Sequence, residues 1–193
     1  QFLEGSFNLL VAGGVGAAPV YPQLKWLSEN GVTADIILGA RSKEQLILLD
    51  DLKKVSDNIY VATNDGSEGT KGFVTDVLKT LIEDKPGYYK ECIAIGPMIM
   101  MKSVAEMTKG YGLRTVVSLN TLMIDGTGMC GACRVTVGGK VKFTCVDGPE
   151  FDGHQVNFEE AMRRQGMYRK EESESHRCNI DEAVEASHKN NKR

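Results

Sequence analysis

Short apolar runs alternate with amphipathic stretches over the first 119 residues of the chain. The runs are nearly continuous rather than alternating, which is typical of parallel strands covered on both faces. They predict five strands, at residues 7–12, 34–38, 59–63, 91–95 and 114–119. Helices are expected between them, at residues 19–29, 43–55, 73–83 and 97–109. Strands that alternate with helices indicate βαβ units, so we predict an α/β fold with an open parallel sheet.

Local signals place the ends of the first two helices. Pro19 suits the first turn of a helix, and Gly31 suits the position just after its end. Residues 39–42 predict a turn after the second strand. Ser42 is expected to cap the following helix, with Gln45 at the capping-box position.

Glycine-rich turns follow the first, third and fourth strands and fall on one edge of the expected sheet. Ligands of open α/β sheets bind beyond the carboxyl ends of the strands. The first turn carries the candidate residues Gly13, Gly14, Gly16, Ala17 and Pro19, where Pro19 replaces the last glycine of a strict G-x-G-x-x-G. Glycines let a pyrophosphate approach the backbone, and a helix N-terminus offers free N–H groups. A glycine-rich turn that binds nothing is the competing interpretation.

The end of the second strand bears on the choice between NAD(H) and NADP(H). An acidic residue that would hold a ribose 2′-hydroxyl is missing there, and Arg41 and Lys43 stand in its place. Basic side chains suit a 2′-phosphate and favour NADP(H), or they form a solvated face.

The pattern changes after residue 119. Residues 120–134 are rich in glycine, and Val135–Val137 and Val141–Thr144 flank Gly138-Gly139 as a predicted hairpin. A short helix is expected at residues 158–165 and a polar tail from residue 169. We therefore divide the chain into a nucleotide-binding domain (1–119), a cluster-binding loop and hairpin domain (120–168) and a C-terminal tail (169–193).

Four residues of the second domain have metal-ligand spacing: Asp125, Cys130, Cys133 and Cys145 form D-x4-C-x2-C-x11-C. Plant-type [2Fe–2S] sites use C-x4-C-x2-C and a distant fourth cysteine, so the pattern fits if a carboxylate takes the first position. Thiolates also bind zinc, but a structural zinc site would favour a second close cysteine pair. Two further interpretations stay open: the thiols carry no metal, or Asp125 only caps its turn.

Composition narrows the partners and the location. Apolar residues make up 41% of the 193 residues, charged residues 25%, and the net charge is -3. This balance gives no basic footprint for nucleic acid, and no apolar run reaches membrane-spanning length. Five cysteines, grouped as CxxC plus single residues, fit metal ligation in a reducing compartment, so a cytoplasmic protein is expected.

The turns together resemble the nucleotide-binding half of the ferredoxin–NADP reductase superfamily. The resemblance rests on Gly13-Gly14-Val15-Gly16-Ala17-Ala18-Pro19, Gly39-Ala40-Arg41-Ser42, Thr63-Asn64-Asp65-Gly66-Ser67 and Gly96-Pro97-Met98. With the motif at 123–133 and Cys145, the chain is similar to the branch that holds the electron-transfer subunits of dihydroorotate dehydrogenase and of NADH-dependent reduced ferredoxin:NADP oxidoreductase. Because Asp125 replaces a cysteine, the second of these subunits is favoured.

This resemblance implies further residues, cofactors and partners. Asp125, Cys130, Cys133 and Cys145 would hold a [2Fe–2S] cluster. The dinucleotide, NAD(H) rather than NADP(H), would also lie against Asp65, Gly66, Gly96, Pro97 and Met98. The family binds FAD in an N-terminal barrel that has no counterpart here, so the chain is expected to be a fragment that holds FAD poorly. In the full-length subunit, FAD would exchange hydride with the dinucleotide, and the cluster would relay single electrons to a large flavoprotein or iron–sulfur subunit. A dihydroorotate dehydrogenase or hydrogenase subunit, and a zinc-stabilised module without redox activity, are the rival interpretations.

Overall fold

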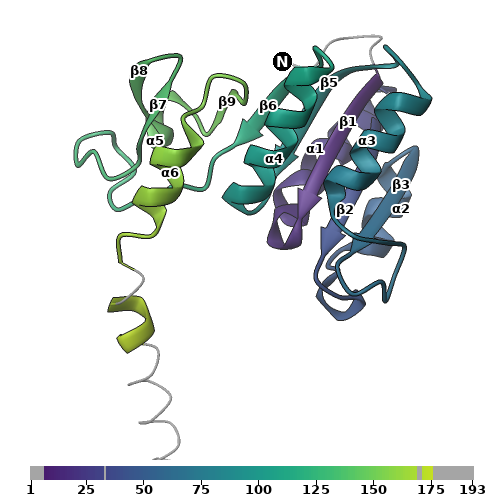
Figure 1. Cartoon of the computed structure of the whole chain (residues 1–193), viewed down its shortest axis with the longest axis horizontal. Coiled ribbons are helices and arrows are strands. Elements are labelled where there is room, and N and C mark those ends of the chain that lie inside the picture. The colour runs from purple at the N-terminus through teal and green to yellow at the C-terminus, as the bar shows by residue number, and fades with distance from the viewer. Residues whose placement is uncertain (1–6, 33, 169–170, 176–193) are drawn as a thin grey trace, which may run out of the picture.

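The computed structural model describes residues 7–32, 34–168 and 171–175. Its main feature is a sheet of seven strands in the order β4-β3-β2-β1-β5-β6-β9 (Figure 1). The strands are β1 (Phe7–Gly13), β2 (Ala34–Ala40), β3 (Asn58–Thr63), β4 (Thr70–Lys71), β5 (Tyr89–Ile95), β6 (Arg114–Ser118) and β9 (Glu150–Asp152). All neighbouring strands run parallel except β9, which is antiparallel to β6. The predicted fold class is confirmed.

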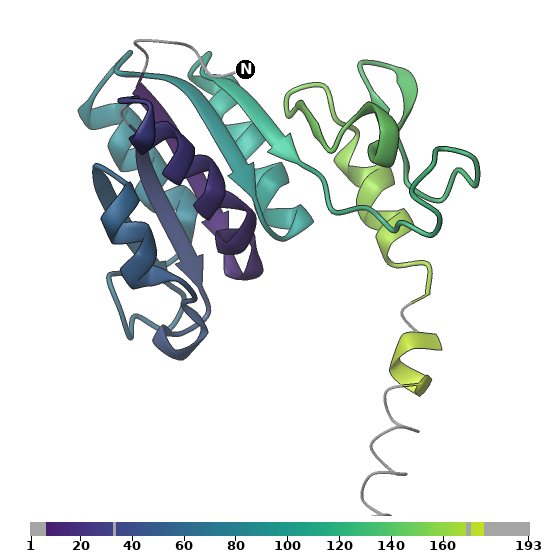
Figure 2. The same ribbon diagram turned by 180° about the vertical axis from the view of Figure 1, so that it is seen from behind.

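Helices cover both faces of this sheet. Helices α1 (Ala17–Glu29) and α2 (Leu49–Val55) lie on one face, and α3 (Val74–Asp84) and α4 (Met98–Gly110) lie on the other (Figures 1 and 2). Strand β1 shows why its apolar run is continuous. Leu9 and Val11 pack with α3 and α4, whereas Leu10 and Ala12 pack with α1 and α2. All four side chains are fully buried, as a central parallel strand requires.

The predicted helix at residues 43–55 is wrong in its first half. A 3-10 turn, η2 (Lys43–Gln45), comes first, and α2 begins only at Leu49. Residues 46–48 separate them: Leu46 is extended, and Leu48 has a φ of 57°, a left-handed conformation that a right-handed helix cannot continue through. The predicted cap also fails, because the Ser42 hydroxyl donates to the Glu44 carboxylate instead of accepting a backbone N–H.

Two other boundaries differ from the prediction. The turn expected at residues 39–42 begins later, because β2 continues to Ala40, which pairs with Thr63 of β3. The first helix begins at Ala17, two positions before Pro19, after the 3-10 turn η1 (Gly14–Gly16).

Residues 120–168 build a smaller module beside β6 (Figure 1). It contains the predicted hairpin of β7 (Arg134–Val137) and β8 (Lys140–Phe143), with both turn glycines at positive φ. Helices α5 (Thr144–Asp147) and α6 (Phe158–Gln165) follow, and Phe158 of α6 packs into the same core as α4. Because β9 also joins the main sheet, the module is fixed to the nucleotide-binding part at two places.

Within the described residues, every helix is too short or too polar to span a lipid bilayer. Residues 171–175 of the predicted tail form an exposed helical turn. The rest of that tail, at 169–170 and 176–193, lies outside the described residues.

Candidate nucleotide site and metal centre

The turn after β1 leads directly into a helix N-terminus at the carboxyl edge of the sheet. Gly16 is the N-cap of α1 and supplies no side-chain cap, and the first turn holds no acidic residue. Ala17 and Ala18 open the helix, and Pro19 occupies its third position, where the missing N–H of proline costs no bond because an N–H there would have no partner within the helix. The positive end of the helix dipole is therefore open to an anion.

Three of the predicted glycines lie together because the turns after β1 and β5 are in contact. A Cβ on Gly16 would stand 2.2 Å from the Ile95 carbonyl oxygen, and a Cβ on Gly96 would stand 3.0 Å from the Gly13 Cα. Gly14 differs, since a Cβ there would meet no atom within 4 Å, but its φ is 53°. Close packing of two turns thus explains Gly13, Gly16 and Gly96, and backbone conformation explains Gly14.

The turn after β5 offers backbone more than side chains. Pro97 is the exposed N-cap of α4. Met98 follows it, but its side chain is 3% exposed and lies in the core. Any contact from Met98 to a dinucleotide would therefore use its backbone.

The turns after β2 and β3 are joined by a network that the sequence did not reveal. Asp65 Oδ1 accepts the backbone N–H of Ser67 at 2.9 Å and its hydroxyl at 2.6 Å. The Ser67 hydroxyl and N–H lower the pKa of the Asp65 carboxyl. Ser67 Oγ in turn accepts the Lys43 N–H at 2.7 Å. The Arg41 carbonyl accepts the Asp65 N–H at 3.2 Å, so Arg41, Asp65 and Gly66 lie together.

The two basic residues of this edge differ in what they contact. Lys43 Nζ lies 2.8 Å from the Glu68 carboxylate, which raises the pKa of Lys43 and lowers that of Glu68. The Arg41 side chain is exposed and has no salt bridge within the described residues. The positive charge of Arg41 and Lys43, which favoured NADP(H), is therefore partly neutralised by Glu68. For the hydrogen-bond network around Asp65 and Ser67, the only sequence signal was the Asx-turn pattern Asp65-Gly66-Ser67.

The four predicted metal ligands form two pairs. Cys133 Sγ and Cys145 Sγ are 3.3 Å apart, and Asp125 Oδ2 accepts the Cys130 N–H at 3.0 Å. In the described part of the chain, no three acidic, cysteine or histidine side chains converge on one point. Cys133 is buried, whereas Cys130 and Asp125 are exposed. The structure thus brings two thiols together and holds the other two ligands on the rim of the same loop.

The chemistry of the loop fits an iron–sulfur group. The Ala132 N–H donates to Cys130 Sγ at 3.4 Å. Amides aimed at cysteine sulfur are the contacts that orient and tune such clusters. Gly126, Gly128 and Gly131 have φ values of 76°, 82° and 69°, which let the loop curve around a central group.

Asp125 also performs the turn-capping role that was its competing interpretation. Its two oxygens accept the N–H groups of Thr127 and Cys130. These bonds, led by the one from Thr127, lower the pKa of the carboxyl and keep it ionised. Each oxygen retains a second lone pair, so a ligand role for Asp125 stays a prediction.

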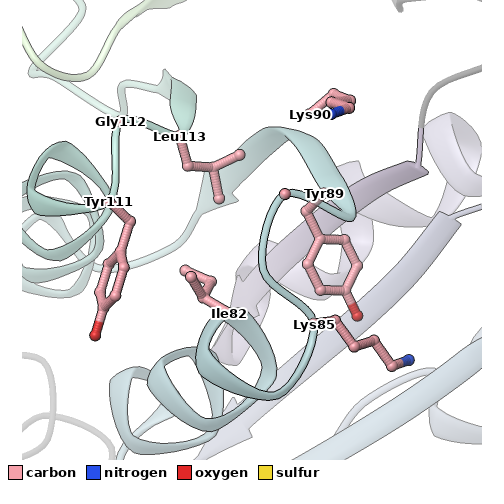
Figure 3. Close-up of a pocket in the computed structure, with 8 residues that line it drawn as sticks. Ile82, Lys85, Tyr89, Lys90, Tyr111, Gly112 and Leu113 are labelled. Atoms are coloured by element: carbon pink, nitrogen blue, oxygen red, sulfur yellow. The ribbon is translucent and has the colours of Figure 1, made fainter.

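A small pocket lies at the opposite, amino edge of the sheet (Figure 3). It is lined by Ile82, Lys85, Gly87, Tyr89, Lys90, Tyr111, Gly112 and Leu113. Its volume of about 210 Å³ is below the range of roughly 300–1,000 Å³ that is usual for ligand pockets. The Tyr89 hydroxyl that borders it is already bonded to the buried Asp35 carboxylate at 2.7 Å. None of the predicted nucleotide contacts lines this pocket.

The sheet, the glycine turn and the open helix end define an oxidoreductase nucleotide-binding domain. Residues 10–106 match the model of the oxidoreductase NAD-binding domain, and the chain belongs to this family. The second module of the chain matches a second, more specific family model. Residues 120–157 match the iron–sulfur cluster binding domain of dihydroorotate dehydrogenase B, which contains all four predicted metal ligands.

Individual relatives agree with this assignment. The chain is 48% identical over 168 residues to a dihydroorotate dehydrogenase B (NAD(+)) electron transfer subunit homolog of Thermotoga maritima, covering 87% of this chain and 58% of the relative. It is 56% identical over 180 residues to an uncharacterized protein of Clostridium beijerinckii, covering 93% of this chain and 60% of the relative. A chain in the structure of NADH-dependent reduced ferredoxin-NADP oxidoreductase superposes with a TM-score of 0.82 at 45% identity, over 93% of this chain and 64% of that one. The chain therefore spans about three fifths of the length of these relatives.

Proposed function

We propose that this chain is the nucleotide- and cluster-binding part of an electron-transfer subunit. One observation carries the proposal: an NAD-binding domain and an iron–sulfur binding domain occupy the same chain, and β9 joins the second to the sheet of the first. A dinucleotide gives up two electrons as a hydride, whereas a [2Fe–2S] cluster, when bound, carries one electron at a time. Flavin, which exchanges both, is the converter expected in the complete subunit.

The dinucleotide is proposed to lie along the carboxyl edge of the sheet. Its pyrophosphate would sit at the N-terminus of α1, over Gly14 and Gly16. The turns with Arg41 and Asp65-Gly66 would contact one end, and the backbone of Gly96-Pro97-Met98 the other. The ion pair between Lys43 and Glu68 supports NAD(H) over NADP(H), because a carboxylate at this place repels a 2′-phosphate.

The cluster is proposed to be [2Fe–2S], held by Asp125, Cys130, Cys133 and Cys145. The adjacent thiols of Cys133 and Cys145 and the Ala132 N–H directed at the Cys130 sulfur support this assignment. The chain's own part is to hold the ligands in one loop and to direct the Ala132 N–H at sulfur. Thiolate ligands of this kind persist in a reducing compartment, so a cytoplasmic location is part of the proposal.

FAD binding and the partner belong to the complete protein. Relatives named electron transfer subunits of dihydroorotate dehydrogenase B, and the structure of NADH-dependent reduced ferredoxin-NADP oxidoreductase, support a large flavoprotein or iron–sulfur subunit as the partner. We favour an assembly of the second type, because Asp125 stands at the first ligand position. A dihydroorotate dehydrogenase or a hydrogenase is the other candidate, and identification of the co-purifying large subunit decides between them.

Anaerobic purification of the chain tests the proposal directly. We expect about two iron atoms and two acid-labile sulfides per chain, a rhombic paramagnetic signal after dithionite reduction, and calorimetric binding of NADH that is tighter than that of NADPH. If the purified chain instead contained one equivalent of zinc and no sulfide, the redox proposal would be wrong. The chain would then be a zinc-stabilised nucleotide-binding module.

A further inference from the structure

Arg164 of α6 lies against the cysteine loop although it is 32 residues away from it in the chain. Its Nη2 donates to the carbonyl oxygen of Ala132 at 3.1 Å. Ala132 stands between Cys130 and Cys133, inside the C-x-x-C turn. The contact exists because α6 packs beside β7, and β7 begins directly after Cys133 (Figures 1 and 2).

This hydrogen bond fixes a part of the turn that the loop does not fix itself. The neighbouring Cys133 carbonyl accepts the Thr144 hydroxyl at 2.9 Å and the Thr144 N–H at 3.2 Å, both from the segment that carries Cys145. The Ala132 carbonyl accepts its hydrogen bond from α6 instead. Arg164 therefore ties the turn to an element outside the loop.

The charge of Arg164 has no obvious structural use. Its Nε atom is buried and has no hydrogen-bond partner in the described part of the molecule. No carboxylate of the described residues forms a salt bridge with its guanidinium group. Leaving a charged donor buried and unsatisfied is unfavourable, so an anionic group close to it would stabilise this arrangement.

We infer that Arg164 is a positioning residue for the cluster loop and that its charge raises the reduction potential of the cluster. This inference rests on the proposed [2Fe–2S] site. Reduction adds one electron, and therefore one negative charge, to the cluster without breaking or forming a covalent bond. A fixed cation beside the Cys130–Cys133 turn stabilises the reduced form more than the oxidised form, because the reduced form is more negative.

The test compares Arg164→Gln with Arg163→Gln under anaerobic conditions. Arg163 is the adjacent residue of α6, is exposed and has no polar contact among the described residues, so its variant removes the same charge without the loop contact. Iron, sulfide and the paramagnetic signal of the parent are measured first, because a parent without a cluster refutes the proposed function and not the role of Arg164.

A dye-mediated redox titration then gives the result. At the midpoint potential of the parent, we expect the reduced-to-oxidised ratio of Arg164→Gln to fall about tenfold, which corresponds to about 59 mV for one electron. Arg163→Gln should change it less than about twofold. Equal midpoints for the two variants would overturn the electrostatic part of the inference.

Arg164→Lys separates charge from position and remains decisive if Arg164→Gln fails to hold a cluster. It should keep the midpoint of the parent, since the charge is retained, but lose its cluster absorbance in air several times faster than Arg163→Lys. Lysine lacks the planar donor pair that lets arginine bond to Ala132 from this distance. A parent-like midpoint together with a parent-like lifetime would overturn the positioning role.

Discussion

The carboxylate of Asp125 accepts the backbone N–H of Cys130 at 3.0 Å. The predicted oxygen ligand is thus bonded to the backbone of the first predicted cysteine ligand. This bond explains why an aspartate suits the position even as a turn residue. It also means that loss of Asp125 would change the loop as well as the ligand set, so the two roles need separate variants.

Replacement of Asp125 by Asn and by Ala separates capping from ligation. Asn retains one oxygen, which can accept the N–H group of Thr127 or of Cys130, whereas Ala retains none, and neither side chain has a charge to bind iron. If Asp125 is a ligand, both Asp125→Asn and Asp125→Ala should retain less than about half of the parent iron and sulfide under identical anaerobic purification. An Asp125→Asn protein with the parent absorption and paramagnetic spectra would assign the fourth ligand elsewhere.

Asp147 provides the matched control for these variants. Its carboxylate accepts the Phe143 N–H at 2.7 Å and lies two residues after Cys145, so it caps the same module without a predicted ligand role. Asp147→Asn should keep the full iron and sulfide content. A similar loss in Asp147→Asn and Asp125→Asn would show that turn stability alone determines cluster retention.

The ion pair between Lys43 and Glu68 predicts a change in nucleotide preference. Glu68→Gln removes the carboxylate that holds Lys43 Nζ at 2.8 Å, and it leaves Lys43 without a salt bridge among the described residues. We expect the Kd for NADPH to fall about two- to fivefold, a modest change because water screens exposed charges, while the Kd for NADH stays constant. Isothermal titration measures both constants.

Glu44→Gln is the control for this prediction. Glu44 is an exposed acid one residue from Lys43, and it accepts a bond from Ser42 rather than from a lysine. Its variant should leave the ratio of the two Kd values unchanged. An unchanged ratio in Glu68→Gln as well would place the adenosine ribose away from this edge.

Contact between the turns after β1 and β5 predicts that Gly16 tolerates no side chain. A methyl group there would stand 2.2 Å from the Ile95 carbonyl oxygen, which belongs to the backbone and has little freedom to move. We expect Gly16→Ala to lower the free energy of unfolding by about 1–3 kcal/mol, and to weaken NADH binding because the turn is displaced. Urea unfolding and calorimetry give the two values.

Gly110→Ala tests whether the effect is specific. A Cβ on Gly110, the last residue of α4, would meet no atom within 4 Å, and its φ is not positive. Alanine is favoured over glycine in helices by roughly 0.5–1 kcal/mol, so this variant should be as stable as the parent or more stable. Equal stability of the two alanine variants would contradict the packing argument.

The sequence predicted what depends on local period and on spacing. Apolar runs located the five long parallel strands, because central strands such as β1 are buried on both faces and leave a continuous signal. The spacing of Cys133 and Cys145 identified two thiols that the fold brings to 3.3 Å. The glycine-rich turns were located as well, because each directly follows the end of a predicted strand.

Other features could not be predicted because they depend on contacts between distant segments. Strands β4 and β9 have only two and three residues, which is too short for a period, and they form because β3 and β6 offer free edges. No glycine or asparagine marks position 48, yet Leu48 adopts a left-handed conformation as the N-cap of α2. Arg164 is one of two adjacent arginines on a polar helix, and only the packing of α6 distinguishes it from Arg163.

The hydrogen bonds to the Asp65 carboxylate predict that the free energy of unfolding decreases at acid pH. Asp65→Asn should make this decrease smaller. The Ser67 hydroxyl and N–H lower the pKa of this carboxyl in the folded protein, so the unfolded chain binds the proton more readily. The contribution is therefore fully present above the unfolded pKa, near pH 4, and is lost as the pH falls through the folded pKa. Asp65→Asn keeps an acceptor for Ser67 but does not titrate, so its deficit relative to the parent should be largest at about pH 7 and shrink toward about pH 3. Urea midpoints at about pH 3, 4, 5 and 7 measure this difference. Asp84→Asn is the control, because Asp84 is an exposed acid with no polar contact among the described residues; its stability should differ from that of the parent by a small and constant amount. A deficit of Asp65→Asn that does not change with pH would refute the role of Asp65 in the acid dependence.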